Sequence, residues 1–262
     1  MTVLSPDEAH TLRRELEASE QLALQQGQSD ALKAYPHMVL PWLDSLMQRR
    51  TIVDAIEQIL GPDVLVWNTS FFIKEANSES FVSWHQDLHY WGLDADDEVT
   101  AWIALSPATA ASGCMRFIAG SHQFADAEHQ DTFAEHNLLS RGQELAVQVD
   151  EDQAVDVVLE PGQMSLHHGK TFHASHPNCS GDRRIGVAIR YIKPSMAQRG
   201  GVRTFATLVR GTDTFGHFEH APAPQGHFAS PDRERAKRAR QLADQVLYSS
   251  AADSGRRVSF SS

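Results

Sequence analysis

The sequence predicts a mainly β protein, an antiparallel β-sandwich with helices packed outside it. Three observations carry this prediction: helix signals near the N-terminus, then short β-rich runs separated by turn residues, then one more helical stretch near the end. No linker divides the chain, so we expect a single domain over 1–262. Within it we expect N-terminal helices over about 1–62, the β core over 63–195, and a C-terminal loop, helix and tail over 196–262.

The N-terminal helices are predicted from capping residues and apolar spacing. Ser5, Pro6 and Glu8 match an N-cap, a proline at the first helical position and a capping-box acid. A second helix is predicted over 43–60, because apolar residues recur there at helical spacing until Gly61.

The β core begins at residues 64–74, which are rich in β-branched and aromatic side chains. Alternation along such a strand puts Asn68, Ser70, Phe72 and Lys74 on one face and Trp67, Thr69, Phe71 and Ile73 on the other. Further strands are predicted over 99–105, 115–118, 145–149, 154–159, 164–168 and 185–192.

Two later segments have other characters. The stretch from His122 to Arg141 is polar and rich in charges, so it is either a lid or a solvated surface loop. Residues 233–247 are predicted to be helical, and we expect the serine-rich tail after them to be disordered.

Composition excludes several classes of protein. With 41% hydrophobic and 22% charged residues the chain can bury a sizeable core, and its formal charge of −11 argues against nucleic-acid binding. No apolar run is long enough to span a bilayer, and no secretory signal starts the chain, so no membrane partner is expected. Only two cysteines occur, which predicts a cytoplasmic protein without a disulfide framework. The sequence gives no indication of oligomeric state.

A candidate metal site starts at His85-Gln86-Asp87. In a strand, residues two apart point to the same side, so His85 and Asp87 can reach one ion from one short segment. Imidazole nitrogen and carboxylate oxygen suit iron(II) held by two histidines and one carboxylate. By itself the pair is a weak signal, because a histidine two residues before an aspartate is common.

The third ligand must come from another strand, and four histidines are available: His167, His168, His173 and His176. At least three of these are expected to be structural or surface residues. His173 is favoured because Arg184 follows eleven residues later in a β-like run, where a guanidinium could bind a cosubstrate carboxylate through two parallel hydrogen bonds. The alternative for Arg184 is a surface salt bridge.

Together these motifs resemble the phytanoyl-CoA dioxygenase family of iron(II)/2-oxoglutarate oxygenases. His85-x-Asp87, then His173 with Ser175 two later and Arg184 eleven later, have the family's order and spacing. The resemblance covers roughly residues 60–195 and extends to the segments WHQDLHYWGL, TAWIALSPATAASGCMRFIAGSH, LEPGQMSLHHGKTFHASHPN and DRRIGVAIRYI.

The resemblance implies a fold, a reaction and a set of site residues. The fold would be a double-stranded β-helix, the cupin-type jelly roll, with 63–195 as its core. The enzyme would use Fe(II), 2-oxoglutarate and dioxygen and would release succinate and carbon dioxide. Carried over by position, the metal ligands are His85, Asp87 and His173, and the residues that bind the cosubstrate are Arg184, Ser175, Trp102 and Ser70. Trp102 has ordinary barrel core as its alternative. No catalytic side chain is expected beyond the metal ligands.

Position 87 separates two reactions within the family. Relatives that halogenate have Ala or Gly in place of the carboxylate ligand, and the vacated position takes chloride. Because Asp87 is present, the resemblance implies a hydroxylase rather than a halogenase.

The substrate is expected to be a small polar metabolite or a natural-product intermediate. Trp91 is the first candidate for a substrate wall, and Lys74 and Arg210 are candidates for contacts with an anionic group; both cations have surface positions as alternatives. Two other functions stay open. One is a non-catalytic jelly-roll protein that binds a small molecule, and the other is a metal-dependent hydrolase that uses the same ligands.

Overall fold

The computed structural model describes residues 1–253, with side chains described up to residue 247. The α-helices are α1 (Pro6–Gln25), α2 (Pro41–Met47), α3 (Arg50–Leu60), α4 (Leu88–Trp91) and α5 (Ser230–Asp253). Short 3-10 helices are η1 (Ser29–Leu32), η2 (Pro36–Met38), η3 (Ser121–Gln123), η4 (Glu151–Gln153) and η5 (Arg199–Gly201). None of the helices in these residues is long and apolar enough to cross a bilayer. The serine-rich end of the tail lies outside the described residues.

The capping box predicted for α1 is confirmed. The Ser5 hydroxyl accepts a hydrogen bond from the Glu8 amide, and the Glu8 carboxylate accepts one from the Ser5 amide. The single helix predicted over 43–60 is wrong, because Arg49 adopts an extended conformation that separates α2 from α3. At the end of α2 the carbonyl of Met47 accepts a hydrogen bond of 2.8 Å from the Tyr191 hydroxyl instead of continuing the helical ladder.

The strands form two main sheets and one hairpin. The larger sheet has six strands in the order β12 (Glu219–His220), β11 (Phe205–Arg210), β1 (Val64–Lys74), β10 (Arg184–Ile192), β3 (Glu98–Ala104) and β8 (Met164–His167). The smaller has four in the order β2 (Val82–His85), β9 (His173–Ser175), β4 (Met115–Ile118) and β7 (Ala154–Val157). The hairpin pairs β5 (His129–Asp131) with β6 (Gln143–Leu145).

The predicted strands have mixed outcomes. The strands predicted over 64–74 and 115–118 are confirmed with both bounds. The strand predicted over 145–149 is wrong, since only its first residue belongs to a strand, β6, and Val147 is exposed. Residue preferences alone do not predict β2 and β9, which are only four and three residues long.

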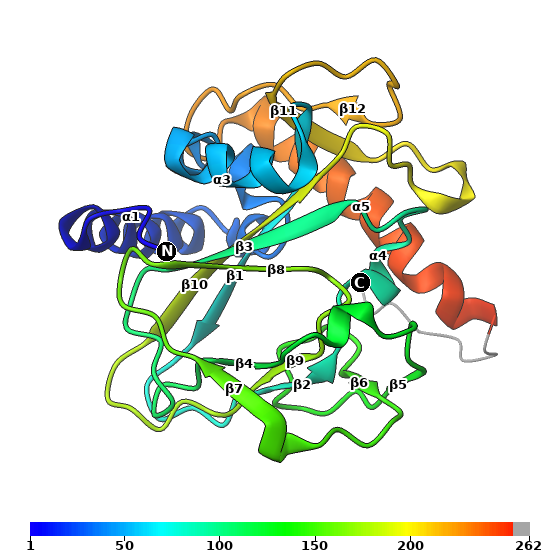
Figure 1. Cartoon of the computed structure of the whole chain (residues 1–262). Helices are drawn as coiled ribbons and strands as arrows, with labels where there is room; N and C mark the ends of the chain where they lie inside the picture. The colour runs from blue at the N-terminus through cyan, green and yellow to red at the C-terminus, as the bar shows by residue number, and fades with distance from the viewer. Residues whose placement is uncertain (254–262) are drawn as a thin grey trace.

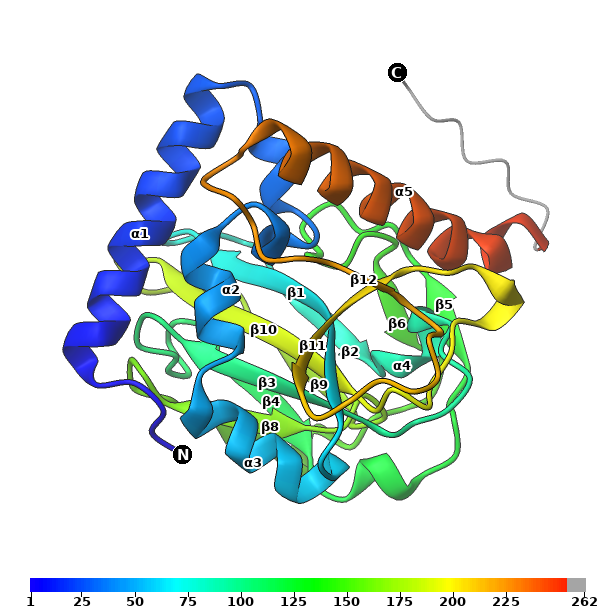
Figure 2. The ribbon, with the colours of Figure 1, turned by 90° about the horizontal axis from the view of Figure 1, so that it is seen from above.

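The layers follow from which face of each element is apolar. Helices α1, α2 and α3 cover the outer face of the six-stranded sheet, and the four-stranded sheet lies on its other side (Figures 1 and 2). The main core fills the space between helices and sheet, where Leu43, Ile56, Val187 and Ile189 are fully buried. Each such side chain contributes roughly 1.5–3 kcal/mol through burial. The inner face of the larger sheet is thereby left to face the smaller one.

Strand β1 contains a bulge that changes which face its residues share. The register with β10 shifts between Val66 and Asn68, so the intervening Trp67 does not alternate with its neighbours. The prediction that Trp67 and Asn68 lie on opposite faces is therefore wrong, because Trp67 packs with Ile192, on the face that Asn68 shares with its register partner Arg190.

Candidate metal centre

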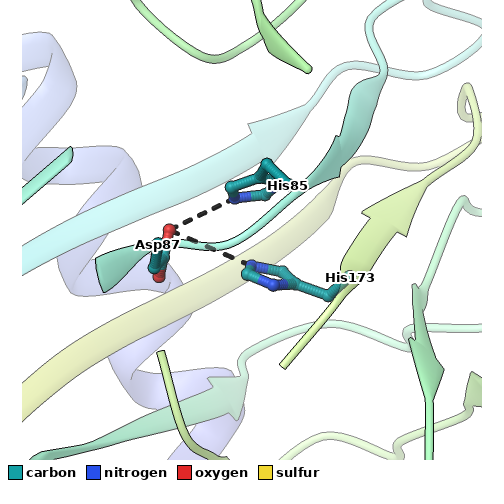
Figure 3. Close-up of side chains that lie close together, drawn as sticks. All are labelled: His85, Asp87 and His173. Atoms are coloured by element: carbon teal, nitrogen blue, oxygen red, sulfur yellow. Dashed lines mark hydrogen bonds and ion pairs between the residues drawn. The ribbon is translucent and has the colours of Figure 1, made fainter. Parts of the chain in front are cut away.

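Three side chains converge between the two sheets. His85 ends β2 and stands opposite His173 of β9 in the sheet register, while Asp87 directly precedes α4. The Nε2 atoms of His85 and His173 lie 3.2 and 4.0 Å from Oδ1 of Asp87 (Figure 3). One ligand atom from each residue lies within 4.8 Å of the others, and all three side chains are buried.

Backbone carbonyls orient both imidazoles. Nδ1 of His85 lies 2.9 Å from the Ser83 carbonyl, and Nδ1 of His173 lies 2.9 Å from the Thr171 carbonyl. Because a carbonyl only accepts, each Nδ1 carries the proton in these bonds, and each Nε2 offers a lone pair toward Asp87. Two such nitrogens and one carboxylate are the donor set of the two-histidine, one-carboxylate iron site. The residues present therefore fit Fe(II).

Electrostatics favour the protonation states that bind a metal. Burial lowers the pKa of His173 well below its ordinary value, which favours the neutral imidazole. Burial opposes ionisation of Asp87, but the neighbouring His85, His173 and Arg190 together outweigh this cost and hold its pKa below the usual range.

The ligands open onto an inner cavity between the sheets, which measures about 400 Å³ including its open mouth. Besides the three ligands its lining includes Phe72, Thr100, Trp102, His167, Ser175, Arg184 and Arg190. The structure thus brings the predicted Trp102, Ser175 and Arg184 to the same cavity as the metal ligands.

Arg184 is a buried cation without a counter-ion among the described residues. It is 1% exposed, its Nε has no hydrogen-bond partner there, and its guanidinium carbon lies 5.4 Å from the centre of the Trp102 ring. Burial lowers its pKa to about 10, so the side chain remains charged at neutral pH. The neighbouring Arg183 points outward and pairs with Glu20 and Glu75. An uncompensated buried charge is costly, so the Arg184 site favours an anion.

Lys74 lies beside Arg184 and not in a position to contact a substrate in either cavity. The two residues are partners in the β1–β10 register, and Lys74 is fully buried. Its Nζ donates to Ser175 Oγ at 2.6 Å and to the carbonyls of Gly113 and His176. Burial, with the nearby charge of Arg184, lowers its pKa to about 6. Lys74 is absent from the lining of either cavity described here, so it supports Ser175 instead of facing a substrate.

Arg210 is not brought to the site. Its guanidinium forms ion pairs of 2.5 Å with Asp54 and 2.6 Å with Glu57, both on α3, and it lines neither cavity. Arg210 therefore lies on the outer side of the larger sheet, which agrees with the surface position given as its alternative.

An outer cavity continues from the metal ligands toward the surface. It measures about 1890 Å³ including its open mouth, and it shares Phe72, His85, Asp87 and Arg190 with the inner cavity. Trp91 forms part of its wall, with its ring centre 5.2 Å from that of Trp67. Ser70 lines this outer cavity and not the inner one. Part of the polar 122–141 stretch also lines it, through residues 138–140.

The remaining histidines of the His173 segment differ in their environments. His168 bonds the Asp96 carbonyl at 2.8 Å, and the exposed His176 lies 2.8 Å from an Arg116 nitrogen. His167 is buried in the inner cavity, where its Nδ1 has no partner among the described residues.

Sequence reasoning missed Arg190, which lines both cavities. A signal was present: Arg190 is six residues after Arg184 on β10, so strict alternation puts the two arginines on one face.

Comparison with known proteins identifies the class. Residues 2–186 match the family model of phytanoyl-CoA dioxygenase. The chain therefore belongs to the phytanoyl-CoA dioxygenase family, whose oxygenases use Fe(II) and 2-oxoglutarate and act on small molecules. Both the predicted family and the predicted jelly-roll fold class are confirmed.

Individual relatives are more distant. The chain is 30% identical over 164 residues to a probable alpha-ketoglutarate-dependent hypophosphite dioxygenase of Stutzerimonas stutzeri, a match that covers 60% of this chain and 54% of that protein. The chain thus spans about half the length of that curated relative. Among solved structures, the apo non-heme monooxygenase ThoJ is 34% identical with a TM-score of 0.87, covering 96% of this chain and 94% of ThoJ. CytC3 with Fe(II) and alpha-ketoglutarate shares the fold, with 21% identity, a TM-score of 0.64 and coverage of 87% and 89%.

Proposed function

We propose that the protein is a dioxygenase that hydroxylates a small polar metabolite or a natural-product intermediate with release of succinate and carbon dioxide. The observation that carries this proposal is the pairing of two features in one cavity: three convergent metal ligands and a buried arginine with no carboxylate partner among the described residues.

Each residue has a role in this proposal. His85, Asp87 and His173 would hold Fe(II), which when bound couples dioxygen activation to decarboxylation of 2-oxoglutarate. Arg184 and Ser175 would bind the distal carboxylate of the cosubstrate, with Lys74 holding the Ser175 hydroxyl in place. Trp102 would hold the guanidinium of Arg184 against its ring. No side chain is required as a general acid or base.

Hydroxylation is favoured over halogenation by Asp87. Its carboxylate faces both imidazole nitrogens, so the third protein ligand is present and no ligand position is vacated for a halide. We also propose a cytoplasmic location, since the two cysteines, Cys114 and Cys179, are free.

The test is oxidation of 2-oxoglutarate by the purified protein supplied with Fe(II) under ¹⁸O₂, followed by mass spectrometry of the succinate. We expect succinate carrying one labelled oxygen, and none from the Asp87→Ala variant. Turnover of candidate esters or amides by zinc-loaded protein without 2-oxoglutarate would instead support the hydrolase. Binding of small molecules without succinate formation under any condition would support the non-catalytic protein.

A further inference from the structure

Arg190 is a second buried cation, and it lies where the two cavities meet. It is 6% exposed and lines both cavities. Its Nη1 donates to Ser70 Oγ at 3.0 Å, and its guanidinium carbon lies 5.3 Å from the Trp91 ring centre and 6.0 Å from that of Phe72. Its Nε has no partner among the described residues.

No carboxylate of the described residues forms an ion pair with Arg190. Two acids are close enough for their charges to interact with it, Asp87 and Glu98. Asp87 is committed to the metal site, and the Glu98 carboxylate accepts a hydrogen bond from the Gly169 amide. A desolvated guanidinium with free donors is an unfavourable arrangement unless a ligand supplies an anion.

Arg190 belongs to a row of polar side chains that crosses four strands of the larger sheet. In register, Asn68 of β1 faces Arg190 of β10, which faces Thr100 of β3, which faces His167 of β8. Each of the three neighbours has a buried polar atom without a partner among the described residues: Asn68 Oδ1, Thr100 Oγ1 and His167 Nδ1. Buried polar atoms are normally satisfied, so a whole row of unsatisfied ones indicates a binding surface.

Arg190 is separate from the cosubstrate arginine. Arg190 follows Arg184 by six positions, which places their backbones roughly 20 Å apart along β10. Arg184 contacts Trp102, whereas Arg190 contacts Ser70 and Trp91, which line only the outer cavity. The Arg190 guanidinium therefore lies at the junction of the inner and outer cavities, away from Arg184.

We propose that Arg190 binds an oxyanion of the substrate, such as a carboxylate or sulfonate, while the outer cavity holds the substrate's apolar body. This inference rests on the proposed function. The outer wall suits an apolar body, because Trp67, Phe72, Trp91 and Leu139 line it. Arginine suits the anion, because its planar fork donates two parallel hydrogen bonds. Of the two substrate classes in the proposed function, this selects a natural-product intermediate that is an apolar acid, whose charged end fixes its position beside the metal.

The test compares two dyes that differ by one sulfonate group: 8-anilinonaphthalene-1-sulfonate and the uncharged N-phenyl-1-naphthylamine. Each is titrated, by fluorescence, into anaerobic protein holding Fe(II) and 2-oxoglutarate. We expect Arg190→Met to weaken binding of the sulfonate at least tenfold while binding of the neutral dye stays within twofold. Arg190→Lys should recover part of the loss. The matched control Arg183→Met changes an arginine that precedes β10 and pairs with Glu20 and Glu75, and it should leave the affinity for both dyes unchanged.

Two further outcomes decide the assignment. The assignment of Arg190 to a substrate anion would be overturned if Arg190→Met lost equal affinity for both dyes. It would also be overturned if the wild type bound the sulfonate dye no more tightly than the neutral one. If Arg190→Met instead shifts the 2-oxoglutarate titration more than twofold, Arg190 serves the cosubstrate and the proposal fails. Failure of the proposed function is recognised by a separate measurement. Wild-type protein with Fe(II) and 2-oxoglutarate would then show no visible charge-transfer band from the bound cosubstrate, and this result does not depend on dye binding.

Discussion

At the scale of single residues, the metal ligands depend on backbone contacts as much as on their own chemistry. The carbonyls of Ser83 and Thr171 fix which nitrogen of His85 and His173 faces Asp87. In both cases the carbonyl belongs to the residue two positions earlier, so each short strand orients its own ligand. The metal site is therefore set before any metal binds.

Replacing Arg184 tests the cosubstrate site. Arg184→Gln removes a buried cation whose hydrogen bonds to a carboxylate are each worth about 1.5–3 kcal/mol, so 2-oxoglutarate should bind roughly 10- to 100-fold more weakly. Because Arg184 has no counter-ion among the described residues, the melting temperature of the metal-free protein should not fall. Calorimetric titration with 2-oxoglutarate measures the first effect and thermal unfolding the second.

The control for this variant is Arg183→Gln, which breaks the exterior ion pairs with Glu20 and Glu75. It should leave 2-oxoglutarate binding unchanged. Equal losses in the two variants would mean that Arg184 acts through the stability of β10 and not by contact with the cosubstrate.

The sequence predicted the residues whose signal is local and missed those whose signal depends on packing. The His85-x-Asp87 spacing was a weak signal by itself, and the family resemblance assigned it together with His173. The expectation that strand alternation brings His85 and Asp87 together is wrong, because β2 ends at His85 and Asp87 has a helical backbone conformation. Arg210 could not be placed, because its ion pairs with Asp54 and Glu57 join residues more than 150 positions apart. Lys74 was assigned to the substrate, but its partner Ser175 lies on the opposite sheet.

At the scale of elements, β10 organises the site. It lies between β1 and β3 in the larger sheet, is buried along its whole length, and presents both arginines toward the smaller sheet. Between them Gly186 leaves room for the Trp102 ring, which crosses over the strand toward Arg184.

Gly186→Ala tests this packing. An added Cβ would lie 1.8 Å from the Trp102 ring, so the ring must move or the strands must separate. We expect a loss of about 1–3 kcal/mol in the free energy of unfolding, measured by thermal or chemical denaturation. Weaker binding of 2-oxoglutarate should accompany it.

Gly181→Ala is the matched control, since an added Cβ there meets nothing within 4 Å. A Gly186→Ala protein as stable as this control would show that the Trp102 ring is not confined against β10.

Elements were predicted well where one residue pattern runs unbroken, as in β1 and α1. They were predicted poorly where a tertiary contact intervenes. The hydrogen bond from Tyr191 to the Met47 carbonyl accompanies a helix break that apolar spacing does not reveal. Strands β2 and β9 are too short for residue preferences to indicate. They form because β2 pairs with β9, and β9 pairs with β4 on its other side.

At the scale of the whole molecule, the site is a product of two sheets packing face to face. The smaller sheet supplies His85 and His173, and the larger supplies Arg184 and Arg190. Motifs along the chain predicted the two histidines. Only the packing of the two sheets, however, brings both histidines and both arginines around one cavity.

Buried histidines make the folded state sensitive to acid. Burial lowers the pKa of His37 to about 3 and that of His167 to about 4. Because these values lie below the unfolded value of about 6.5, the unfolded chain binds protons first as the pH falls. Stability is therefore complete above roughly pH 6.5 and declines below it, by about 1.4 kcal/mol per pH unit for each such group until its folded pKa is reached.

His37→Gln tests this dependence away from the metal site. His37 is 1% exposed, and its ring bonds the Thr69 hydroxyl at 2.9 Å. The variant should flatten the fall in melting temperature between pH 6.5 and 4, whereas His10→Gln, at an exposed position on α1, should leave the slope unchanged. A slope unaffected by His37→Gln would mean that burial does not lower the pKa of this histidine in the folded protein.

The most direct test that this site binds Fe(II) and 2-oxoglutarate is an anaerobic spectroscopic titration of the metal-free protein with both. A chelate of the cosubstrate at an open-sided iron site should give a weak charge-transfer band near roughly 500 nm in the wild type. Asp87→Ala should weaken or abolish it by removing a ligand. Wild-type protein that binds iron but gives no band on addition of 2-oxoglutarate would contradict the assignment.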